Sequence, residues 1–175
     1  MLFRSKVIHK FVFWVAYTTL IFCFANSLHP RQEIGIKPST IALIHKFEGT
    51  SKTAYQDSEG NWTIGVGHFI KNTEEHLRWA TLKAHEVEHL LKRDLKPCER
   101  FLTTDLGRPL NQNQFDDLMS LCFNIGVDRL ASSNVIQDIK RNQYHSAANS
   151  FLYWNRPSVL EQRRRQERKL FLTDI

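Results

Sequence analysis

The chain has 175 residues, of which 42% are hydrophobic and 24% charged, and its formal net charge is +6. These values are ordinary for a globular protein and exclude a disordered or collagen-like chain. The length predicts one domain that is large enough to bury a core.

The first 27 residues differ from the rest. They begin with a basic segment without acidic residues, continue with an apolar run over residues 11–25, and carry small side chains at Ala25 and Ser27. This order is typical of a secretory signal peptide, and the apolar run is short for a membrane-spanning helix. A retained N-terminal membrane anchor is the alternative interpretation. In both cases we expect the rest of the chain to be exported, either to the periplasm or out of the cell.

Half of the excess positive charge belongs to this leader. The remaining chain has 21 basic and 18 acidic residues. Such a small excess suits an anionic polymer such as a cell wall and gives little support for nucleic-acid binding, which we do not expect. We expect a monomer that touches a membrane only through residues 11–25, if these are retained.

Residues 28–37 are polar and predict a linker. A helix is predicted to follow, with Ser39 or Thr40 as its N-cap and an end at Gly49. Glu48 is then the last residue of that helix. Because the C-terminal end of a helix disfavours negative charge, this position favours the protonated carboxyl group that a general acid needs.

A short β-hairpin is predicted next, with strands near residues 53–56 and 62–66 and turn residues between them. Asp57 and Thr63 share a face of this hairpin only if the loop has an odd number of residues. We therefore expect three or five loop residues rather than two.

The remainder of the chain has helical patterns. A long amphipathic helix is expected over residues 81–102, which Pro97 should kink or split, and another runs from a cap at Asn111 to an end near Gly126. Shorter helices are expected at residues 134–141, 146–153 and 160–172. A small hairpin followed by many helices predicts an α+β domain, mostly helical, over residues 38–175.

Three cysteines are present. Cys23 belongs to the leader, whereas Cys98 and Cys122 belong to the exported part, where an oxidising compartment permits a disulfide. The alternative, which the sequence alone slightly favours, is two buried thiols on packed helices. The cysteines do not have the spacing of metal ligands.

Glu48, Asp57 and Thr63 are the candidate catalytic residues. Paired carboxyl groups across a cleft hydrolyse glycosidic bonds, because one protonates the leaving oxygen while the other, ionised, positions or activates water. Two acids nine residues apart would by themselves be expected on a solvated surface. The sequence that surrounds them changes this interpretation.

Residues 48–68, EGTSKTAYQDSEGNWTIGVGH, resemble the phage-type lysozymes, the T4-like and endolysin group of glycoside hydrolase family 24. That family has a Glu, an Asp nine residues later, a Thr six further on, and then I-G-x-G-H. Residues 110–126 (LNQNQFDDLMSLCFNIG) and 160–171 (LEQRRRQERKLF) also resemble it. The resemblance covers nearly the whole exported chain. It implies a lysozyme-like two-lobed fold with a small hairpin lobe, a long linking helix and a helical lobe.

The resemblance also implies muramidase activity on peptidoglycan glycan strands, at the β-1,4 bond between N-acetylmuramic acid and N-acetylglucosamine, without a cofactor or a metal. Glu48 is implied as the general acid, with Asp57 and Thr63 positioning the water. The family favours inversion, which needs the two carboxyl groups about 6.5–9.5 Å apart.

Other residues match family positions of known role. His68 is expected to be structural and to pair with Asp94, which would raise the pKa of His68. Substrate contacts are implied at Phe69, Phe123, Ser133 and Asn149. Asn149 is the looser match because the spacing before it is shorter, and Phe123 fits a core residue equally well.

Two alternatives to a lysozyme remain. His85, Glu86 and His89 fit the H-E-x-x-H pattern of zinc peptidases, although no motif supplies a third ligand. The other alternative is a wall-binding protein that has lost catalysis.

The arginine run 163–165 does not require nucleic acid. Arg163 and Arg164 lie four and three residues before Glu167, which predicts a solvated helix with internal salt bridges.

Overall fold

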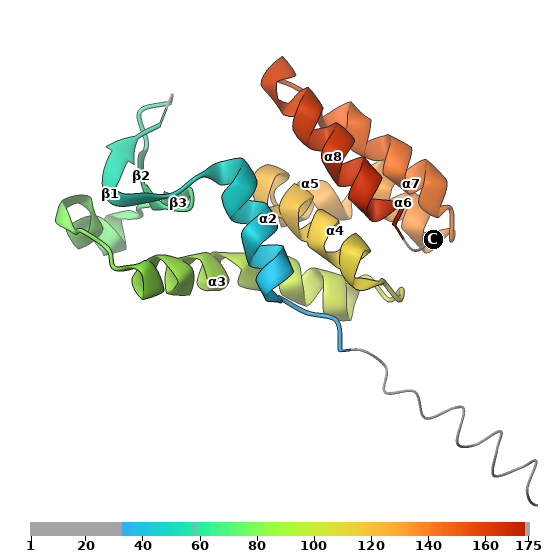
Figure 1. Ribbon diagram of the computed structural model, residues 1–175, viewed down its shortest axis with the longest axis horizontal. Coiled ribbons are helices and arrows are strands. Elements are labelled where there is room, and N and C mark those ends of the chain that lie inside the picture. The colour runs from blue at the N-terminus through green and yellow to red at the C-terminus, as the bar shows by residue number, and fades with distance from the viewer. Residues whose placement is uncertain (1–32, 58, 174–175) are drawn as a thin grey trace, which may run out of the picture. The chain divides into compact units, whose positions relative to one another are not determined.

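The computed structural model describes residues 33–57 and 59–173, so the expected leader and most of the expected linker lie outside it. Residues 34–175 form one unit. In this unit a small sheet is followed by many helices, which confirms the mostly helical α+β class (Figure 1). Among the described residues, none of the helices has the length and apolar character needed to span a membrane.

The sheet has three antiparallel strands in the order β1-β2-β3. They are β1 (Ser51–Gln56), β2 (Trp62–Gly65) and β3 (His68–Phe69). Five residues, 57–61, join β1 to β2, so the expectation of an odd loop is confirmed. Tyr55 pairs with Thr63, and Thr63 pairs with Phe69. Because directly paired residues share a face, these three side chains lie on one side of the sheet.

Helices make up most of the remaining chain. In order they are α2 (Pro38–Glu48), η1 (Asn72–Trp79), α3 (Ala84–Arg100), η2 (Phe101–Asp105), α4 (Gln112–Ile125), α5 (Val127–Ala131), α6 (Asn134–Lys140), α7 (Tyr144–Ser150), η3 (Phe151–Trp154), η4 (Ser158–Leu160) and α8 (Glu161–Phe171). Pro97 does not split α3. The helix continues through it and passes into the π-helical η2, where the Leu106 N–H donates to Phe101 O at 2.8 Å.

The helix caps differ from expectation at one place. The N-cap of α2 is Lys37, not Ser39 or Thr40, because Pro38 occupies the first helical position. Thr40 instead accepts a hydrogen bond from the Lys37 N–H at 3.0 Å. The expected cap of α4 at Asn111 and its end at Gly126 are confirmed, as is the end of α2 at Gly49.

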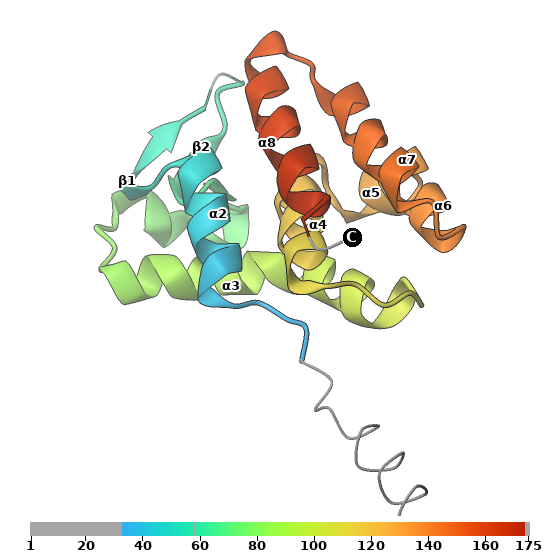
Figure 2. The same ribbon diagram turned by 45° about the vertical axis from the view of Figure 1, so that its right-hand side comes forward.

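The long helix α3 connects two groups of elements (Figures 1 and 2). The sheet packs on its N-terminal part, whereas α4 and η2 contact its C-terminal part. α5 and α8 contact α4, and α6 and α7 pack against each other beside them. Fully buried apolar side chains fill the helical group, among them Leu95, Phe115, Leu118, Phe151 and Phe171. α2 packs against α4, so the C-terminal end of α2 lies where the two groups meet.

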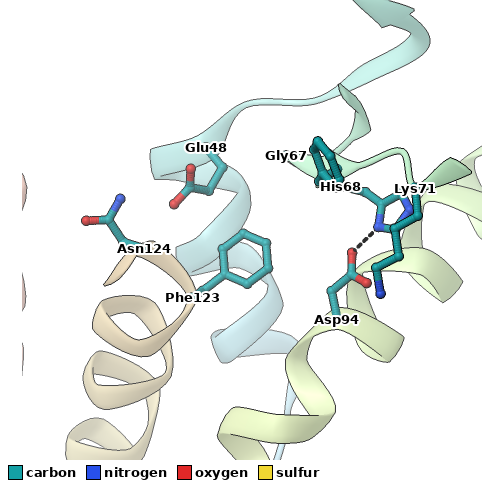
Figure 3. Close-up of a pocket in the computed structure, with 8 residues that line it drawn as sticks. Glu48, Gly67, His68, Lys71, Asp94, Phe123 and Asn124 are labelled. Atoms are coloured by element: carbon teal, nitrogen blue, oxygen red, sulfur yellow. Dashed lines mark hydrogen bonds and ion pairs between the residues drawn. The ribbon is translucent and has the colours of Figure 1, made fainter. Parts of the chain in front are cut away.

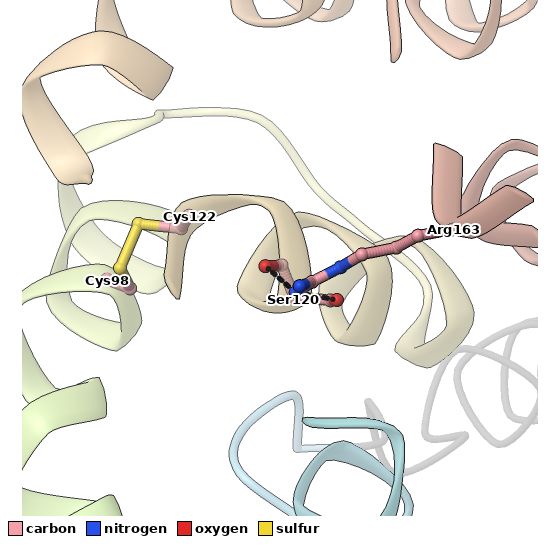
Figure 4. The surroundings of a disulfide bond; sticks show 4 residues. All are labelled: Cys98, Ser120, Cys122 and Arg163. Atoms are coloured by element: carbon pink, nitrogen blue, oxygen red, sulfur yellow. Dashed lines mark hydrogen bonds between the residues drawn. A yellow bond between two sulfur atoms is a disulfide. The ribbon is translucent and has the colours of Figure 1, made fainter. Parts of the chain in front are cut away.

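Cys98 of α3 and Cys122 of α4 form a disulfide, with their Cα atoms 6.0 Å apart (Figure 4). The favoured expectation of two free thiols is therefore wrong. Both residues are buried, as that expectation required, but a pattern of apolar positions does not reveal that two helices bring their sulfur atoms into contact.

The C-terminal helix α8 also corrects an expectation. Arg163 and Arg164 do pair with Glu167, but all three side chains are buried rather than solvated. The outward side of α8 instead carries the exposed pair Arg165–Glu161. Spacing along a helix predicts which charges meet, but it does not predict which side of the helix faces the core.

Candidate active site

A pocket of about 290 Å³ lies between α2, the β3 segment, α3 and α4 (Figure 3). Its lining residues are Glu48, Gly67, His68, Phe69, Lys71, Asp94, Phe123 and Asn124. The pocket thus brings together the candidate acid Glu48 and two of the residues expected to contact substrate, Phe69 and Phe123. Phe69 is half exposed, and Phe123 is partly buried against the core, so both interpretations of Phe123 are compatible with its position.

Glu48 is held by a cation from the other end of the chain. Arg163 Nη1 donates to Glu48 Oε1 at 2.7 Å, and the guanidinium of Arg163 lies over the ring of Phe47, 4.8 Å from its centre. The position of Glu48 at the last residue of α2 agrees with expectation. The contact with Arg163 was not part of that expectation.

Arg163 itself is fixed by buried partners. Its Nε donates to Glu167 Oε1 at 3.0 Å, and its Nη2 donates to the backbone oxygen of Ser120 at 3.0 Å and to Ser120 Oγ at 3.1 Å (Figure 4). The Ser120 hydroxyl in turn donates to Glu167 Oε1 at 2.7 Å. Burial raises the pKa of Glu167, while the two neighbouring guanidiniums, Arg164 and Arg163, act to lower it. Glu167 and Ser120 therefore fix the position of Arg163, and Arg163 in turn fixes the carboxylate of Glu48.

Asp57 and Thr63 do not line the pocket. Asp57 begins the hairpin loop, where its Oδ1 accepts hydrogen bonds from the backbone N–H groups of Asn61 at 2.8 Å and Glu59 at 2.9 Å. The hydrogen bond from the Asn61 backbone is the main cause that lowers the pKa of Asp57, so this carboxyl group is ionised at neutral pH. Thr63 is buried in β2, and its hydroxyl donates to Asn61 O at 3.4 Å.

His68 makes the expected contact with Asp94: its Nδ1 lies 2.7 Å from Asp94 Oδ2 (Figure 3). The hydrogen bond to Asp94 raises the pKa of His68, in the direction that the pairing predicts. On the other side of the ring, Nε2 lies 3.2 Å from both Glu74 Oε2 and Arg93 Nη2. Arg93 also pairs with Glu74 at 2.7 Å. This cluster joins β3, η1 and α3 at the floor of the pocket.

The remaining candidates for substrate contact lie away from the pocket lining. Ser133 is the N-cap of α6, where its hydroxyl donates to Leu130 O at 2.6 Å. Asn149 is exposed on α7 and its Oδ1 accepts a hydrogen bond from Arg168 Nε at 2.9 Å. Neither is brought next to Glu48.

The H-E-x-x-H pattern lies on the exposed side of α3. His85 and His89 are exposed, and Glu86 Oε2 accepts a hydrogen bond from the Lys83 backbone N–H at 2.6 Å, which caps the helix. Throughout residues 33–57 and 59–173, no three His, Cys, Asp or Glu side chains are grouped as metal ligands. The pattern has a sufficient structural explanation in helix capping.

Sequence reasoning missed three residues of the site: Arg163, Lys71 and Asn124. Arg163 lay within one of the strings that carry the family resemblance, and that was the available signal. Asn124 also lay within such a string, residues 110–126, directly after Phe123. Lys71 lies outside these strings, and no pattern distinguished it from surface residues.

Comparisons with known proteins point to one family. The family model described as Phage lysozyme matches residues 45–167. The endolysin of Salmonella phage P22 is 40% identical over 143 residues, which is 79% of this chain and 98% of that protein. The SAR-endolysin of Haemophilus phage HP1 (strain HP1c1) is 30% identical over 116 residues, which is 66% of this chain and 60% of that protein.

Structural similarity leads to the same group. A crystal structure of P22 lysozyme matches with a TM-score of 0.72 and 38% identity, covering 81% of this chain and 100% of that one. This match confirms the expected two-lobed, lysozyme-like fold.

Proposed function

Because the chain belongs to the phage lysozyme family, we propose that it is a lysozyme that lyses peptidoglycan by cleaving the β-1,4 bond between N-acetylmuramic acid and N-acetylglucosamine. The observation that carries the proposal is the position of Glu48. Its carboxyl group lines a pocket between the two lobes, beside the aromatic rings of Phe69 and Phe123. Aromatic faces are suited to pack on sugar rings, and they place a glycan next to the acid.

Glu48 is the general acid in this proposal. Arg163 engages Oε1 of Glu48, so Oε2 is the oxygen that protonates the glycosidic oxygen of the leaving sugar. Asp57 is the ionised partner that orients the attacking water, and Thr63 binds that water. The lowered pKa of Asp57 supports this division of roles, since one carboxyl group must donate a proton while the other stays charged. Attack by water on the opposite face of the sugar gives inversion.

The neighbouring roles follow from the same assignment. Phe69, Phe123, Ser133 and Asn149 contact the glycan, the last two at sugars further from the cleaved bond. His68 and Asp94 brace the sheet against α3 and take no part in proton transfer. The enzyme needs no cofactor or metal. It is exported and acts as a monomer on the peptidoglycan of the cell wall. The leader and the resemblance to a SAR-endolysin support export.

The test is lysis of purified cell walls by the full-length protein and its Glu48→Gln variant. We expect Glu48→Gln to abolish lysis while thermal unfolding remains cooperative. Glu161→Gln is the matched control, because it also removes a carboxylate from a Glu–Arg pair, at 2.6 Å, but on the exposed side of α8. Lysis by Glu48→Gln at the rate of the wild type would overturn the proposal.

Two further outcomes separate the alternatives. Loss of lysis in EDTA, restored by zinc, would favour a peptidase that uses His85 and His89. Binding to walls without the release of reducing sugar by the wild type would favour a wall-binding protein that has lost catalysis.

A further inference from the structure

Asn124 is a polar side chain in the pocket whose orientation is fixed from behind. Arg164 Nη2 donates to Asn124 Oδ1 at 2.9 Å. An arginine has donors and no acceptor, so the side of the amide that faces Arg164 must be its oxygen. The NH₂ group then lies on the other side, which Figure 3 shows as the side nearer to Glu48.

The arginine that orients Asn124 is itself held firmly. Arg164 is fully buried, and its Nη1 lies 3.1 Å from Glu167 Oε2, close enough for an ion pair although the atoms are not aligned for a hydrogen bond. Glu167 also accepts from Arg163, which reaches Glu48. The contacts thus run from Asn124 through three buried charged residues to Glu48, and both ends line the same pocket.

A donor of fixed direction is suited to one kind of partner. Sugar hydroxyl groups rotate and can donate or accept, so they do not require an amide that is locked in one orientation. The carbonyl oxygen of an acetamido group only accepts hydrogen bonds. Acetamido groups are carried by both sugars of the substrate assigned above, next to the bond that Glu48 would protonate.

We propose that Asn124 determines specificity by donating a hydrogen bond to the acetamido carbonyl of an N-acetylated sugar bound beside Glu48, with Arg164 as its positioning residue. This inference rests on the proposed lysozyme function. Asn124 then discriminates N-acetylated from de-N-acetylated glycan, because de-N-acetylation replaces the carbonyl acceptor by an ammonium group.

The variant Asn124→Asp tests the donor. It keeps an oxygen for Arg164 and replaces the NH₂ donor by an acceptor. The measurement is kcat/KM on one peptidoglycan preparation before and after de-N-acetylation. On N-acetylated glycan we expect a loss of roughly 3- to 10-fold, the usual effect of one hydrogen bond to a neutral group, and no such loss on de-N-acetylated glycan. The ratio of the two rates therefore falls by about the same factor.

Two more variants complete the test. Asn124→Ala removes the donor without adding a charge and is expected to lower the same ratio, which covers the case in which Asn124→Asp fails to fold. Asn142→Asp adds the same charge at an exposed loop residue with φ 60° and should leave the ratio unchanged. Arg164→Lys, which frees the amide to turn, should raise KM on N-acetylated glycan more than it lowers kcat.

The outcomes distinguish failure of the role of Asn124 from failure of the proposed lysozyme function. A wild-type protein that does not lyse walls overturns the proposed function. An active wild type whose ratio is unchanged by both Asn124→Asp and Asn124→Ala overturns the role of Asn124 and leaves the lysozyme assignment intact.

Discussion

Arg163 and Glu48 are 115 residues apart in the chain and 2.7 Å apart in the structure. The same guanidinium lies over Phe47, so α8 contacts both of the last two residues of α2. The position of the candidate acid therefore depends on the C-terminal helix as well as on the helix that carries it. Substitutions in α8 should therefore change the active site even though no residue of α8 lines the pocket.

Replacing Arg163 by Met should destabilise the fold by about 3–5 kcal/mol, because Glu167 then stays buried without the cation that contacts its Oε1. Urea unfolding measures the change. Wall lysis should fall with it, since Glu48 loses its partner. The double variant Arg163→Met/Glu167→Met should not recover the stability, because Arg164 then stays buried without its ion-pair partner Glu167. Arg165→Met, in the exposed pair with Glu161, is the control and should cost less than about 1 kcal/mol. If the single variant Arg163→Met were as stable as the wild type, Arg163 would not stabilise the fold through Glu167.

Asp117 predicts a variant that is more stable than the wild type. This side chain is fully buried, and neither of its carboxyl oxygens has a hydrogen-bond partner within the part of the chain that the structure describes. Burial, with the charges of Glu167 and Asp116, raises the pKa of Asp117 to about 10. The folded state thus holds a proton that the unfolded state releases above the ordinary pKa of 3.8, so the fold loses stability as pH rises from there toward 10.

Asn has the shape of the protonated acid and no charge to bury. Asp117→Asn should therefore match the wild type near pH 4 and exceed it by a few kcal/mol, of order 1.4 kcal/mol per unit of pKa shift, at pH 8. Denaturant unfolding at both pH values measures this. Asp116→Asn is the contrast, because Asp116 accepts hydrogen bonds from Thr40 at 2.5 Å and from Gln112 at 2.8 Å and should gain nothing from neutralisation. An Asp117→Asn variant that is no more stable at pH 8 would show that Asp117 has a partner.

The His68–Asp94 pair predicts a pH effect of the same sign as that of Asp117, because both groups have a raised pKa in the folded state. Its hydrogen bond raises the pKa of His68, so the stabilisation is complete below the ordinary value of 6.5 and is lost as pH rises through the folded pKa. Asp94→Asn should lower the pKa of His68, as followed by NMR titration of the ring, and should cost more stability at pH 5 than at pH 9. Lys92→Gln, on the exposed side of α3, is the control. If the titration of His68 were unchanged in Asp94→Asn, the pairing of His68 with Asp94 as a structural contact would be wrong.

The sequence predicted those parts of the fold that local pattern determines. Strand parity predicted an odd loop of three or five residues, and five are present. Cap chemistry predicted the start of α4 at Asn111 and the end of α2 at Gly49. The third strand, β3, was missed because two residues are too few to show alternation. The N-cap of α2 was misplaced by two or three residues, since a proline at the first helical position moved the cap to Lys37.

Parts of the site that depend on distant contacts were not predictable in this way. The pairing of Arg163 and Arg164 with Glu167 is local and was expected, but their burial and the contact with Glu48 depend on how α8 packs against α2 and α4. The orientation of Asn124 depends on the same packing, because its partner Arg164 is 40 residues away. Glu48, Phe69 and Phe123 were placed together only because a family resemblance supplied the distant part of the argument.

The Cys98–Cys122 bond joins the helix that carries Asp94 to the helix that carries Phe123 and Asn124. Disulfides of this kind form in oxidising compartments and stay open in the cytosol. In the exported enzyme proposed above, a newly made chain is therefore a dithiol and becomes crosslinked only after it crosses the membrane. The bond closes a loop of 24 residues, which corresponds to roughly 3 kcal/mol of chain entropy. If export follows the proposed function, the redox state of this one pair records which side of the membrane a molecule has reached, and the crosslinked molecules outside are the more stable ones.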